Sequence, residues 1–296
     1  MNFKETYDQK RTDVEHALEK LMLRPDGRLA DHIKAMRYSL FAGGKRVRPV
    51  LCIAASQTID PAIEPVMTVA CAFECIHTYS LIHDDLPAMD NDDLRRGKPT
   101  NHKVFGEAEA ILAGDGLLTY AFELLSDPHV SSRIFPENQL RLIRIIAQAA
   151  GSLGMVGGQA IDMDSEGKEI SFDTLQYIHS RKTGALITAS VQAGAICANA
   201  SKDQFAALTC YGEKIGLAFQ IVDDLLNVEG TTEQLGKSAG SDAELEKATY
   251  PAYFGVETSR SKAHEAISAA KDILDIFGGN AVFLRELADY ILTRKK

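Results

Sequence analysis

The chain has few of the residues that form disulfide bonds or zinc sites. It contains no tryptophan and five cysteines, an odd number without a CxxC pair. Scattered cysteines without zinc-type spacing are typical of reduced thiols in a cytosolic protein. A chain of 296 residues buries roughly three quarters of its unfolded surface, so its fold needs no disulfide or zinc ion. The five cysteines are Cys52, Cys71, Cys75, Cys197 and Cys210.

Positive charge is also in short supply. The 32 lysines and arginines are outnumbered by 41 aspartates and glutamates, which gives a net charge of −9 at pH 7. Nucleic-acid binding usually requires a basic face, so we expect no nucleic-acid partner. Anionic substrates remain compatible with this charge where metal ions or clustered lysines and arginines reverse its sign locally.

Signals for a membrane are weak. The first residues, MNFKET, are charged from the start and contain no apolar signal region, so we expect a cytoplasmic protein. Residues 183–201 carry no charge over 19 positions, a length close to that of a membrane span. Thr, Ser, Gln, Asn and Gly interrupt this stretch, and its small residues suit close packing. We expect a core helix there and no stable membrane insertion.

Alternating β-branched runs are absent as well, whereas helical periodicity is present along the whole sequence. No low-complexity or Pro/Ser-rich linker divides the chain, so we expect one all-α domain over residues 1–296. Ser171 or Asp173 is the expected N-cap of one helix. Helices are predicted over residues 3–21, 32–41, 47–56, from Pro65 through the first aspartate pair, 108–125, 138–150, 171–179, 185–200, 202–228 and 259–277.

The most informative feature present is a cluster of five aspartates and two arginines in residues 84–96, directly after the uncharged residues 76–82. Carboxylates at a helix C-terminus face the negative end of the helix dipole, and adjacent like charges repel. The requirements of folding alone do not explain why the sequence places these unfavourable charges at the end of a helix. A bound divalent cation would offset it, because Mg²⁺ takes one or two carboxylates together with substrate phosphates.

A second aspartate cluster changes how the first is interpreted. Residues 219–227 again place an Asp pair, Asp223-Asp224, after an apolar run. Asp223 and Asn227 are four residues apart and therefore share one helical face. A lone Asp pair would fit a solvated acidic loop. Two such clusters predict a shared site for metal ions and a diphosphate.

Residues 43–49 place three cations behind two glycines. Glycine lets a backbone approach an anion closely, and arginine can donate to two phosphate oxygens at once. Alone, the segment would fit a solvated basic turn equally well, and it does not match a nucleotide P-loop. His77 lies seven residues before Asp84, close to two helical turns, and could line the same wall. Further cations follow the aspartates or lie later: Arg95, Arg96, Arg181, Lys182, Lys237 and Lys247.

No nucleophile with a partner base stands out, and no GxSxG elbow is present. Catalysis is therefore expected from electrostatic stabilisation of a leaving diphosphate and from positioning. Residues 229–249 form a polar, glycine-containing connection just after the second cluster. Its length favours a loop that covers the site over an ordinary connector.

In combination, these motifs resemble those of the trans-isoprenyl diphosphate synthases. Residues 74–90 are especially similar to bacterial farnesyl diphosphate synthases, in which four residues separate the first Asp pair from the last Asp. The ordered motifs span residues 43–251, and helical patterns continue to both ends, so the resemblance covers essentially the whole chain. The matching segments are Gly43–Pro49, Asp84–Gly97, Lys182–Gly184, Phe219–Asp224, Gly236-Lys237 and Lys247–Pro251.

The resemblance implies a magnesium-dependent condensation. An allylic diphosphate (dimethylallyl, then geranyl) ionises to a carbocation and diphosphate. The double bond of isopentenyl diphosphate attacks the cation, and a proton is lost to the departing diphosphate. Three Mg²⁺ ions per active site are implied, for which Mn²⁺ can substitute. The implied fold is a bundle of ten or more helices around a central apolar cavity, the isoprenoid synthase fold, in a homodimer. Such a cavity suits a carbocation that must be kept from water.

Site residues are implied motif by motif. The expected metal ligands are Asp84, Asp90 and Asp223, with Asp85 and Asp224 in support, and these five aspartates with Lys182 and Lys237 are the expected catalytic residues. Isopentenyl diphosphate would be held by Lys45, Arg48, His77 and Arg96. The allylic substrate or its leaving diphosphate would be held by Arg95, Lys182, Thr183, Gln220, Lys237 and Lys247.

One position departs from the family pattern. The second motif usually ends in Asp, and here it ends in Asn227. An amide oxygen is a weaker ligand for a hard cation than a carboxylate. We expect activity to survive, because Asp223, the expected direct ligand, is present.

Product length is predicted from the helix that ends at Asp84. Tyr79 and Ser80 lie five and four residues earlier, on the part of the helix that points below the metals. The product grows away from the diphosphate by five carbons per cycle, so the bulky Tyr79 should act as a floor. Family members with short products also place bulk at this position. We therefore expect the C15 product, farnesyl diphosphate, although Tyr79 packing between helices is the simpler structural alternative.

Three other functions share part of this pattern. A geranylgeranyl (C20) synthase would share every other motif and would differ at the position of Tyr79, the expected floor of the cavity. A class I terpene cyclase would share the fold and the first motif, but it needs no second diphosphate substrate, and its Asn, Ser and Glu triplet is missing here. A non-catalytic partner subunit would lose aspartates, and only Asn227 points that way.

Overall fold

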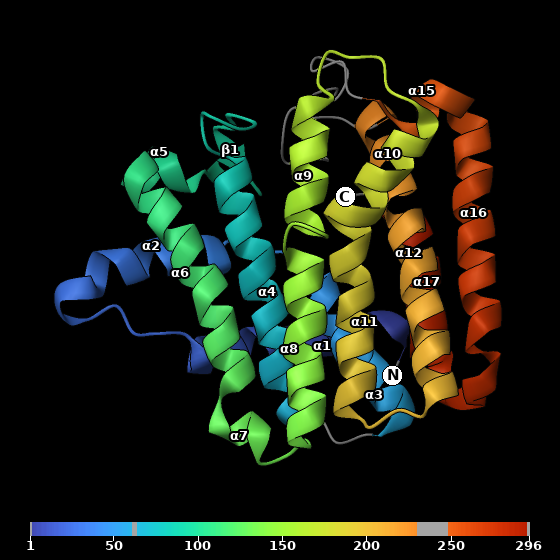
Figure 1. Cartoon of the computed structure of the whole chain (residues 1–296), viewed down its shortest axis with the longest axis horizontal. Helices are drawn as coiled ribbons and strands as arrows, with labels where there is room; N and C mark the ends of the chain where they lie inside the picture. The colour runs from blue at the N-terminus through green and yellow to red at the C-terminus, as the bar shows by residue number, and fades with distance from the viewer. Residues whose placement is uncertain (1, 61–63, 230–247, 295–296) are drawn as a thin grey trace. The chain divides into compact units, whose positions relative to one another are not determined.

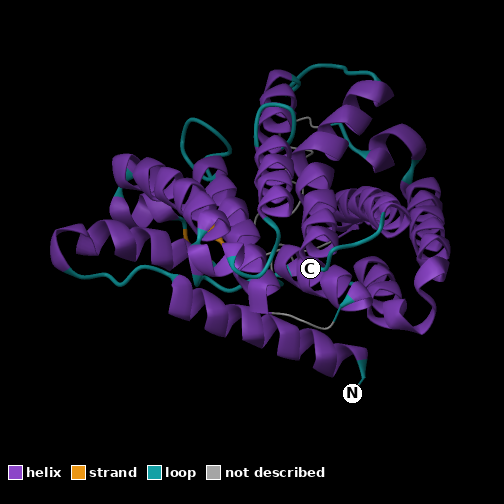
Figure 2. Ribbon diagram, turned by 60° about the horizontal axis from the view of Figure 1, so that its bottom comes forward, coloured by secondary structure: helices purple, strands orange, loops and turns teal. Residues whose placement is uncertain are grey.

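A computed structural model of the chain describes residues 2–60, 64–229 and 248–294. Helices make up almost all of these residues (Figure 1), and the described strands are one pair of two residues each (Figure 2). The predicted all-α class is therefore confirmed. The chain forms two compact units, one of Met1–Val50 and Glu64–Gln139 and the other of Leu51–Ile63 and Leu140–Lys296. The expected single domain stays a prediction.

The first unit is built around α4, which packs against α1, α2 and α6 (Figure 1). Helix α4 is apolar on nearly all sides, which suits a helix surrounded by others. The β1–β2 hairpin follows α4 directly and is antiparallel. The elements of this unit are α1 (Phe3–Leu21), η1 (Gly27–Leu29), α2 (Ala30–Leu40), α4 (Glu64–Asp84), β1 (Leu94–Arg95), β2 (Lys98–Pro99), α5 (Asn101–Phe105), α6 (Glu107–Ser126) and α7 (Pro128–Ser131).

Helix α1 fixes one of the motif segments. Its N-terminus is closed by a capping box, in which the Asn2 side chain accepts from the Glu5 amide at 2.9 Å and the Glu5 carboxylate accepts from the Asn2 amide at 3.1 Å. Tyr7, Val14 and Leu18 form the buried apolar face of this helix. The Tyr7 hydroxyl donates to the backbone oxygen of Lys45 at 2.7 Å. The first helix therefore anchors the basic segment 43–49.

The second unit is built around α12, which packs against α11, α16 and α17 (Figure 1). Helix α3 (Val47–Ile59) begins in the first unit and continues into the second, and α8 (Pro136–Ala150) does the same. The other elements are α9 (Met155–Asp164), α10 (Phe172–Ile178), η2 (His179–Gly184), α11 (Ala185–Cys197), α12 (Lys202–Glu229), α15 (Tyr250–Phe254), α16 (Val256–Ile273), η3 (Leu274–Ala281) and α17 (Val282–Thr293).

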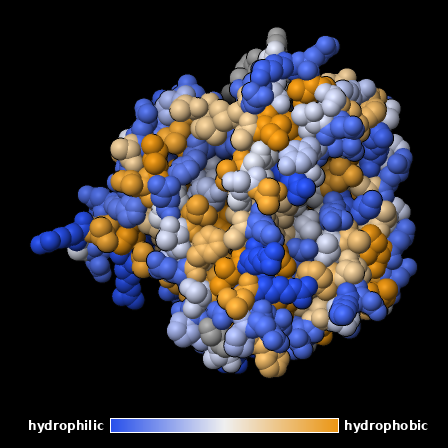
Figure 3. Space-filling model, viewed as in Figure 1, coloured by the Kyte–Doolittle hydropathy of each residue, from blue (hydrophilic) through white to orange (hydrophobic). Residues whose placement is uncertain are grey.

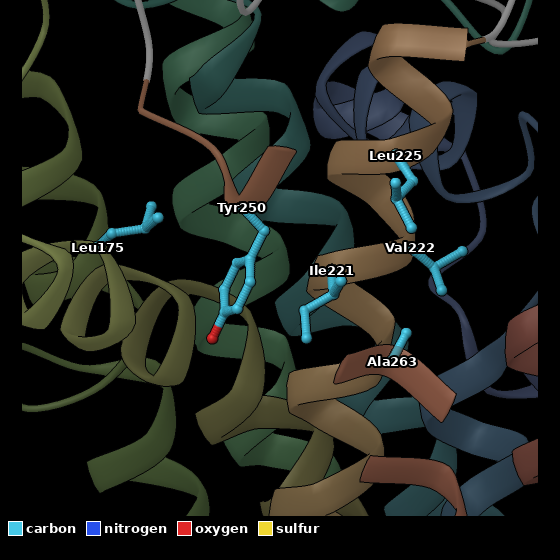
Figure 4. Packing of buried hydrophobic residues seen from close by; sticks show 6 residues of the cluster. All are labelled: Leu175, Ile221, Val222, Leu225, Tyr250 and Ala263. Carbon is cyan, nitrogen blue, oxygen red and sulfur yellow. The ribbon is translucent and has the colours of Figure 1, made fainter. Parts of the chain in front are cut away.

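A hydrophobic cluster on α12 holds the second aspartate motif in place. Figure 4 shows Tyr250 beside Ile221 of α12, with Leu175 of α10 on its other side. Val222 and Leu225 contribute the neighbouring positions of α12. Apolar core residues thus flank the two aspartates on both sides along α12, which fixes the direction of both carboxylates.

The uncharged stretch 183–201 is a core helix, as predicted. Nearly all of α11 is buried, and Gly194 lies so close to α3 that an added Cβ would come within 2.1 Å of the Cys52 backbone oxygen. One described stretch, residues 136–164, is long and apolar enough to span a membrane by length and composition. It comprises α8 and α9, which are separate helices. Figure 3 shows hydrophobic side chains interspersed with polar ones on the face that it presents.

Candidate active site

The first aspartate motif forms a tight turn at the end of α4. The helix ends at Asp84, and the chain then folds back so that the Asp90 amide donates to the Asp84 backbone oxygen at 2.9 Å. Within the turn the Met89 amide donates to the Leu86 backbone oxygen, also at 2.9 Å. The turn therefore brings together two of the three predicted metal ligands at one end of α4.

Asp85 has a different environment from its neighbour. Its side chain is buried and accepts from Nε of Arg95 at 2.8 Å, while Nη2 of Arg95 also donates to Asp92 at 3.0 Å. Burial raises the pKa of Asp85 to about 6, against the opposing effect of Arg95. This buried pair attaches the β1–β2 hairpin to the end of α4. The supporting role expected for Asp85 is compatible with that position, and the substrate role expected for Arg95 stays a prediction.

Arg96 lies over the two glycines of the basic segment. It occupies the hairpin turn with Gly97, and both residues have positive φ, 55° and 75°. Positive φ is uncommon for a residue with a side chain. The Arg96 guanidinium donates to the Gly43 backbone oxygen, and a Cβ on Gly44 would come within 2.7 Å of its Cζ. Glycine is favoured at position 44 by its φ of 136°, and it also leaves room for the Arg96 guanidinium.

Arg46, the middle cation of the same segment, is a structural residue. Its side chain is fully buried and donates to Glu15 at 2.7 Å, to the Leu40 backbone oxygen at 2.6 Å and to Glu74. The two carboxylates raise the pKa of Arg46 against the effect of burial. The residue joins α1 to α4, which leaves Lys45 and Arg48 as the predicted substrate-binding cations of this segment.

His77 on α4 is surrounded by positive charge. Burial lowers the pKa of His77 well below its usual value, and Arg48 and Arg96 are the next two contributors. The imidazole is therefore neutral at pH 7 and lies within electrostatic range of both guanidinium groups. Three of the four residues predicted to hold isopentenyl diphosphate are thus brought together. The positive charge of such a cluster suits an anion, and the expected role in binding isopentenyl diphosphate stays a prediction.

The second aspartate motif belongs to a chain of hydrogen bonds in the second unit. Thr183 Oγ1 donates to Gln220 at 2.9 Å, and Gln220 Nε2 donates to Asp224 at 3.0 Å. Asp224 is buried, and its other oxygen accepts from the Tyr250 amide at 2.9 Å. The chain connects η2, α12 and α15. Three predicted site residues therefore meet here, and the supporting role expected for Asp224 stays a prediction.

Asp223 has a partner that sequence reasoning missed. Its carboxylate is 41% exposed and accepts from Arg294 Nη2 at 2.6 Å. The Arg294 side chain is almost fully buried, lies 3.7 Å from the Phe219 ring centroid and also donates to the Phe219 backbone oxygen. Seventy-one positions separate the two charged residues, so no local spacing could have linked them.

Lys182 lies on a π-helical segment, η2. Such segments are rare and frequent at functional sites. Its ammonium group donates to Asp162 of α9 at 2.7 Å. Helix α9 can approach this closely because of Gly158, where an added Cβ would come within 2.3 Å of the Lys182 backbone nitrogen. Asp162 and Gly158 were also missed, although the polar sequence Gly157-Gly158-Gln159 inside a helix was a usable signal.

His179 packs against residues of the same hydrogen-bond chain. Its ring stacks on Tyr250 with centroids 5.6 Å apart, and Nε2 lies 3.8 Å from Asp224. Burial lowers the pKa of His179 to about 4. The imidazole is therefore neutral near pH 7 and helps to position the second motif through packing.

The remaining predicted residues fall into two groups. Tyr79 and Asn227 are buried, and Ser80 Oγ donates to the His77 backbone oxygen at 2.9 Å. Lys237 and Lys247 lie outside the described residues, as does most of the predicted loop 229–249. Their expected roles stay predictions.

A cavity of about 900 Å³ lies in the second unit between α8, α10, η2, α11 and α12. Its described lining includes Gln148, His179, Arg181, Glu213 and Lys214, and neither aspartate of the second motif is among the lining residues. A lining with so many charged and amide groups does not suit an isoprenoid chain. This cavity is therefore not the apolar cavity that the resemblance implies.

Comparison with known proteins gives consistent matches along the chain. The family model described as polyprenyl synthetase matches residues 31–276. The farnesyl diphosphate synthase of Geobacillus stearothermophilus is 50% identical over 285 residues, which are 95% of each chain. A geranylgeranyl diphosphate synthase of Cyanophora paradoxa is 47% identical over 285 residues, 95% of this chain and 93% of that protein. The solved structure of an FPP/GFPP synthase from Zymomonas mobilis superposes with a TM-score of 0.88 at 40% identity, covering 98% of this chain and 99% of the other.

Proposed function

Because this chain belongs to the polyprenyl synthetase family and has the isoprenoid synthase fold, we propose that it makes farnesyl diphosphate. The reaction condenses isopentenyl diphosphate with dimethylallyl diphosphate and then with geranyl diphosphate. In each cycle the allylic C–O bond breaks, a C–C bond forms to isopentenyl diphosphate, and the proton released goes to the departing diphosphate.

One observation carries this proposal. A single helix, α4, carries the carboxylates of Asp84 at its C-terminal end and His77 two turns earlier, where Arg48 and Arg96 add positive charge. The acidic end suits a diphosphate that binds through metal ions, and the basic cluster suits a diphosphate that binds directly. A reaction with two diphosphate substrates needs both kinds of site. A terpene cyclase has one diphosphate substrate and no use for the second.

The aspartates fit magnesium by their chemistry. Asp84, Asp90 and Asp223 offer hard carboxylate oxygens, and the Asp223 carboxylate is partly exposed. Within the described residues, no three His, Cys, Asp or Glu side chains gather closely enough to hold an ion by themselves. Diphosphate oxygens would therefore complete the coordination, as is usual for Mg²⁺. Three ions per site, with Mn²⁺ as a substitute, remain part of the proposal. When bound, the metal supplies positive charge that stabilises the leaving diphosphate.

The chain's own residues bind and orient the two substrates and keep water away from them. Lys45, Arg48, His77 and Arg96 would hold isopentenyl diphosphate and aim its double bond. Arg95, Lys182, Thr183, Gln220, Lys237 and Lys247 would hold the allylic substrate. Holding the two reacting carbons close together removes the entropy cost of their encounter.

Tyr79 supports C15 as the final product. The residue is buried on α4 one turn before Asp84, and its ring would stop a chain that grows away from the metals. A geranylgeranyl synthase is the alternative, since a relative with that activity is 47% identical to this chain. Asn227 is buried, which favours a supporting role for it over direct metal binding. A cytoplasmic homodimer is the expected form.

The test is product analysis of the purified chain. It would be incubated with Mg²⁺, dimethylallyl diphosphate and an excess of isopentenyl diphosphate, and the dephosphorylated products separated by chromatography. Farnesol as the main product is the expected result. Geranylgeraniol would favour the C20 alternative, and the absence of any condensation product would favour a partner subunit.

A further inference from the structure

A second aromatic residue supports the proposed floor. His83 lies one helical turn after Tyr79 on α4, and the two rings meet edge to face, with centroids 5.7 Å apart and planes at 78°. This geometry is favourable for aromatic pairs and restricts rotation of the tyrosine ring. The position of Tyr79 therefore depends on where the His83 ring is held.

The neighbouring helix α6 holds that ring. His83 Nε2 donates to the Ile111 backbone oxygen at 3.1 Å, and the Asp115 carboxylate lies 3.9 Å from the same nitrogen. The imidazole is thus fixed to the backbone of α6 and not to a mobile side chain. A backbone partner within a packed helix allows little drift of the ring.

Gly114 makes this contact possible. A Cβ at this position would come within 2.2 Å of His83 Nε2 and 2.5 Å of its Cδ2. No side chain fits at position 114 while the imidazole stays in place. Glycine inside a helix costs about 1 kcal/mol relative to alanine, so its presence in the middle of α6 calls for a packing reason. The His83 ring supplies that reason.

We propose that Gly114, His83 and Tyr79 form a stack that determines product length, with Gly114 and His83 as positioning residues for the tyrosine floor. The inference rests on the proposed function. Displacement of the His83 ring would remove the support on one side of Tyr79. The phenol ring could then turn away from the growing chain, and a fourth five-carbon unit would fit.

The first test is Gly114→Ala, with Gly116→Ala as the matched control. Both substitutions add one methyl group to α6. At Gly116 the methyl would meet only His32 Nε2 and the end of the flexible Met36 side chain at 3.1 Å, which small shifts relieve. Gly114→Ala should raise the ratio of C20 to C15 products at least about tenfold, which is roughly 1.4 kcal/mol of changed preference. Gly116→Ala should leave that ratio at the wild-type value.

The second test uses His83→Ala, alone and combined with Gly114→Ala. If both substitutions act by displacing one ring, the double variant should give the same product ratio as His83→Ala alone. Thermal unfolding monitored by circular dichroism identifies variants that are folded. A merely structural contact would lower the melting temperature or the rate without changing the product ratio. If Gly114→Ala does not fold, His83→Ala still tests the proposal, because the substitution of His83 adds no atoms to the packed helices.

Folded, active His83→Ala and Gly114→Ala enzymes that still stop at C15 would overturn the stack as a length determinant. So would additive effects of the two substitutions on the product ratio. A wild-type chain that makes no C15 product would overturn the proposed function itself, and the inference would fall with it. The wild-type measurement therefore distinguishes the two failures.

Discussion

Arginines of the basic motifs have different surroundings in this protein. Arg46 is buried against Glu15 and Glu74, whereas Arg48 and Arg96 surround a neutral histidine. All three would look equivalent as members of a basic cluster in the sequence. The difference follows from the partners, because the Arg46 side chain lies between Glu15 of α1 and Glu74 of α4. Charge alone does not identify a substrate-binding residue.

The different surroundings of Arg46 and Arg48 predict that one substitution lowers stability and the other weakens substrate binding. Arg46→Met leaves Glu74 buried without its partner and should lower the free energy of unfolding by about 3–5 kcal/mol. Arg48→Ala should instead raise the KM for isopentenyl diphosphate roughly 10- to 100-fold, as expected for a lost charged hydrogen bond. Urea unfolding and steady-state kinetics measure the two effects. An equal loss of stability in both variants would contradict the assignment.

His179 predicts a dependence of stability on pH. Its pKa is about 4 in the folded chain and near 6.5 when unfolded, so between these values the unfolded state binds a proton that the folded state does not. Stability from this residue is therefore complete above pH 6.5 and falls on acidification, by about 3 kcal/mol in total at pH 4.

The substitution His179→Gln removes this term, and His264→Gln at an exposed position of α16 is the matched control. The melting temperature should fall less between pH 7.5 and pH 5 in His179→Gln than in the wild type. The control should follow the wild-type profile. Parallel pH profiles for all three proteins would show that His179 is not the group responsible.

Tyr79 gives the third prediction at the residue scale. Tyr79→Ala removes the ring that would form the floor, so products should shift toward C20 and longer while condensation continues. Chromatography of the dephosphorylated products measures the shift. An unchanged C15 product from a folded, active Tyr79→Ala enzyme would leave Tyr79 as an ordinary packing residue.

At the scale of elements, the sequence predicts the long helices well. Periodic apolar positions with clear turn residues give 202–228 for α12 (Lys202–Glu229) and 108–125 for α6 (Glu107–Ser126). Ser171 is the N-cap of α10, since its hydroxyl accepts from the Thr174 amide at 3.1 Å. Local signals suffice in these cases because each helix carries its own apolar face and its own termini.

Two elements that the sequence did not predict, α9 and η2, depend on tertiary contacts. Helix α9 contains Gly157 and Gly158, which disfavour a helix intrinsically, and it forms where a glycine lets it approach η2. The π-helical form of η2 has no sequence signal of its own. The pairing of Arg294 with Asp223 likewise requires the fold. Motif spacing gives the residues expected in the site, and it does not predict which of them are held by buried partners.

The contact between α9 and η2 predicts the effect of Gly158→Ala. The added methyl would meet the backbone of Lys182, which cannot move as freely as a side chain. Unfolding free energy should fall by about 1–3 kcal/mol, and kcat should fall because η2 also carries Thr183. Gly279→Ala in η3 is the control, since no described atom lies within 4 Å of its Cβ. Wild-type stability and kcat in Gly158→Ala would show that η2 tolerates the displacement.

At the scale of the whole molecule, the predicted site residues are distributed over the two compact units. The first unit carries Asp84, Asp90 and the basic cluster around His77. The second carries Asp223 and the hydrogen-bond chain from Thr183 to Tyr250. We propose that the aspartates of both units act on one leaving diphosphate through Mg²⁺.

The kcat values of Asp84→Ala, Asp223→Ala and the double variant, at saturating Mg²⁺ and both substrates, test this claim most directly. Each single substitution should lower kcat on the order of 10²-fold or more, as does the loss of other electrostatic stabilisers of a transition state. The double variant should lose much less than the product of the two effects, because the aspartates act as a unit. A near-normal kcat in either single variant, or fully multiplicative losses in the double variant, would contradict the account.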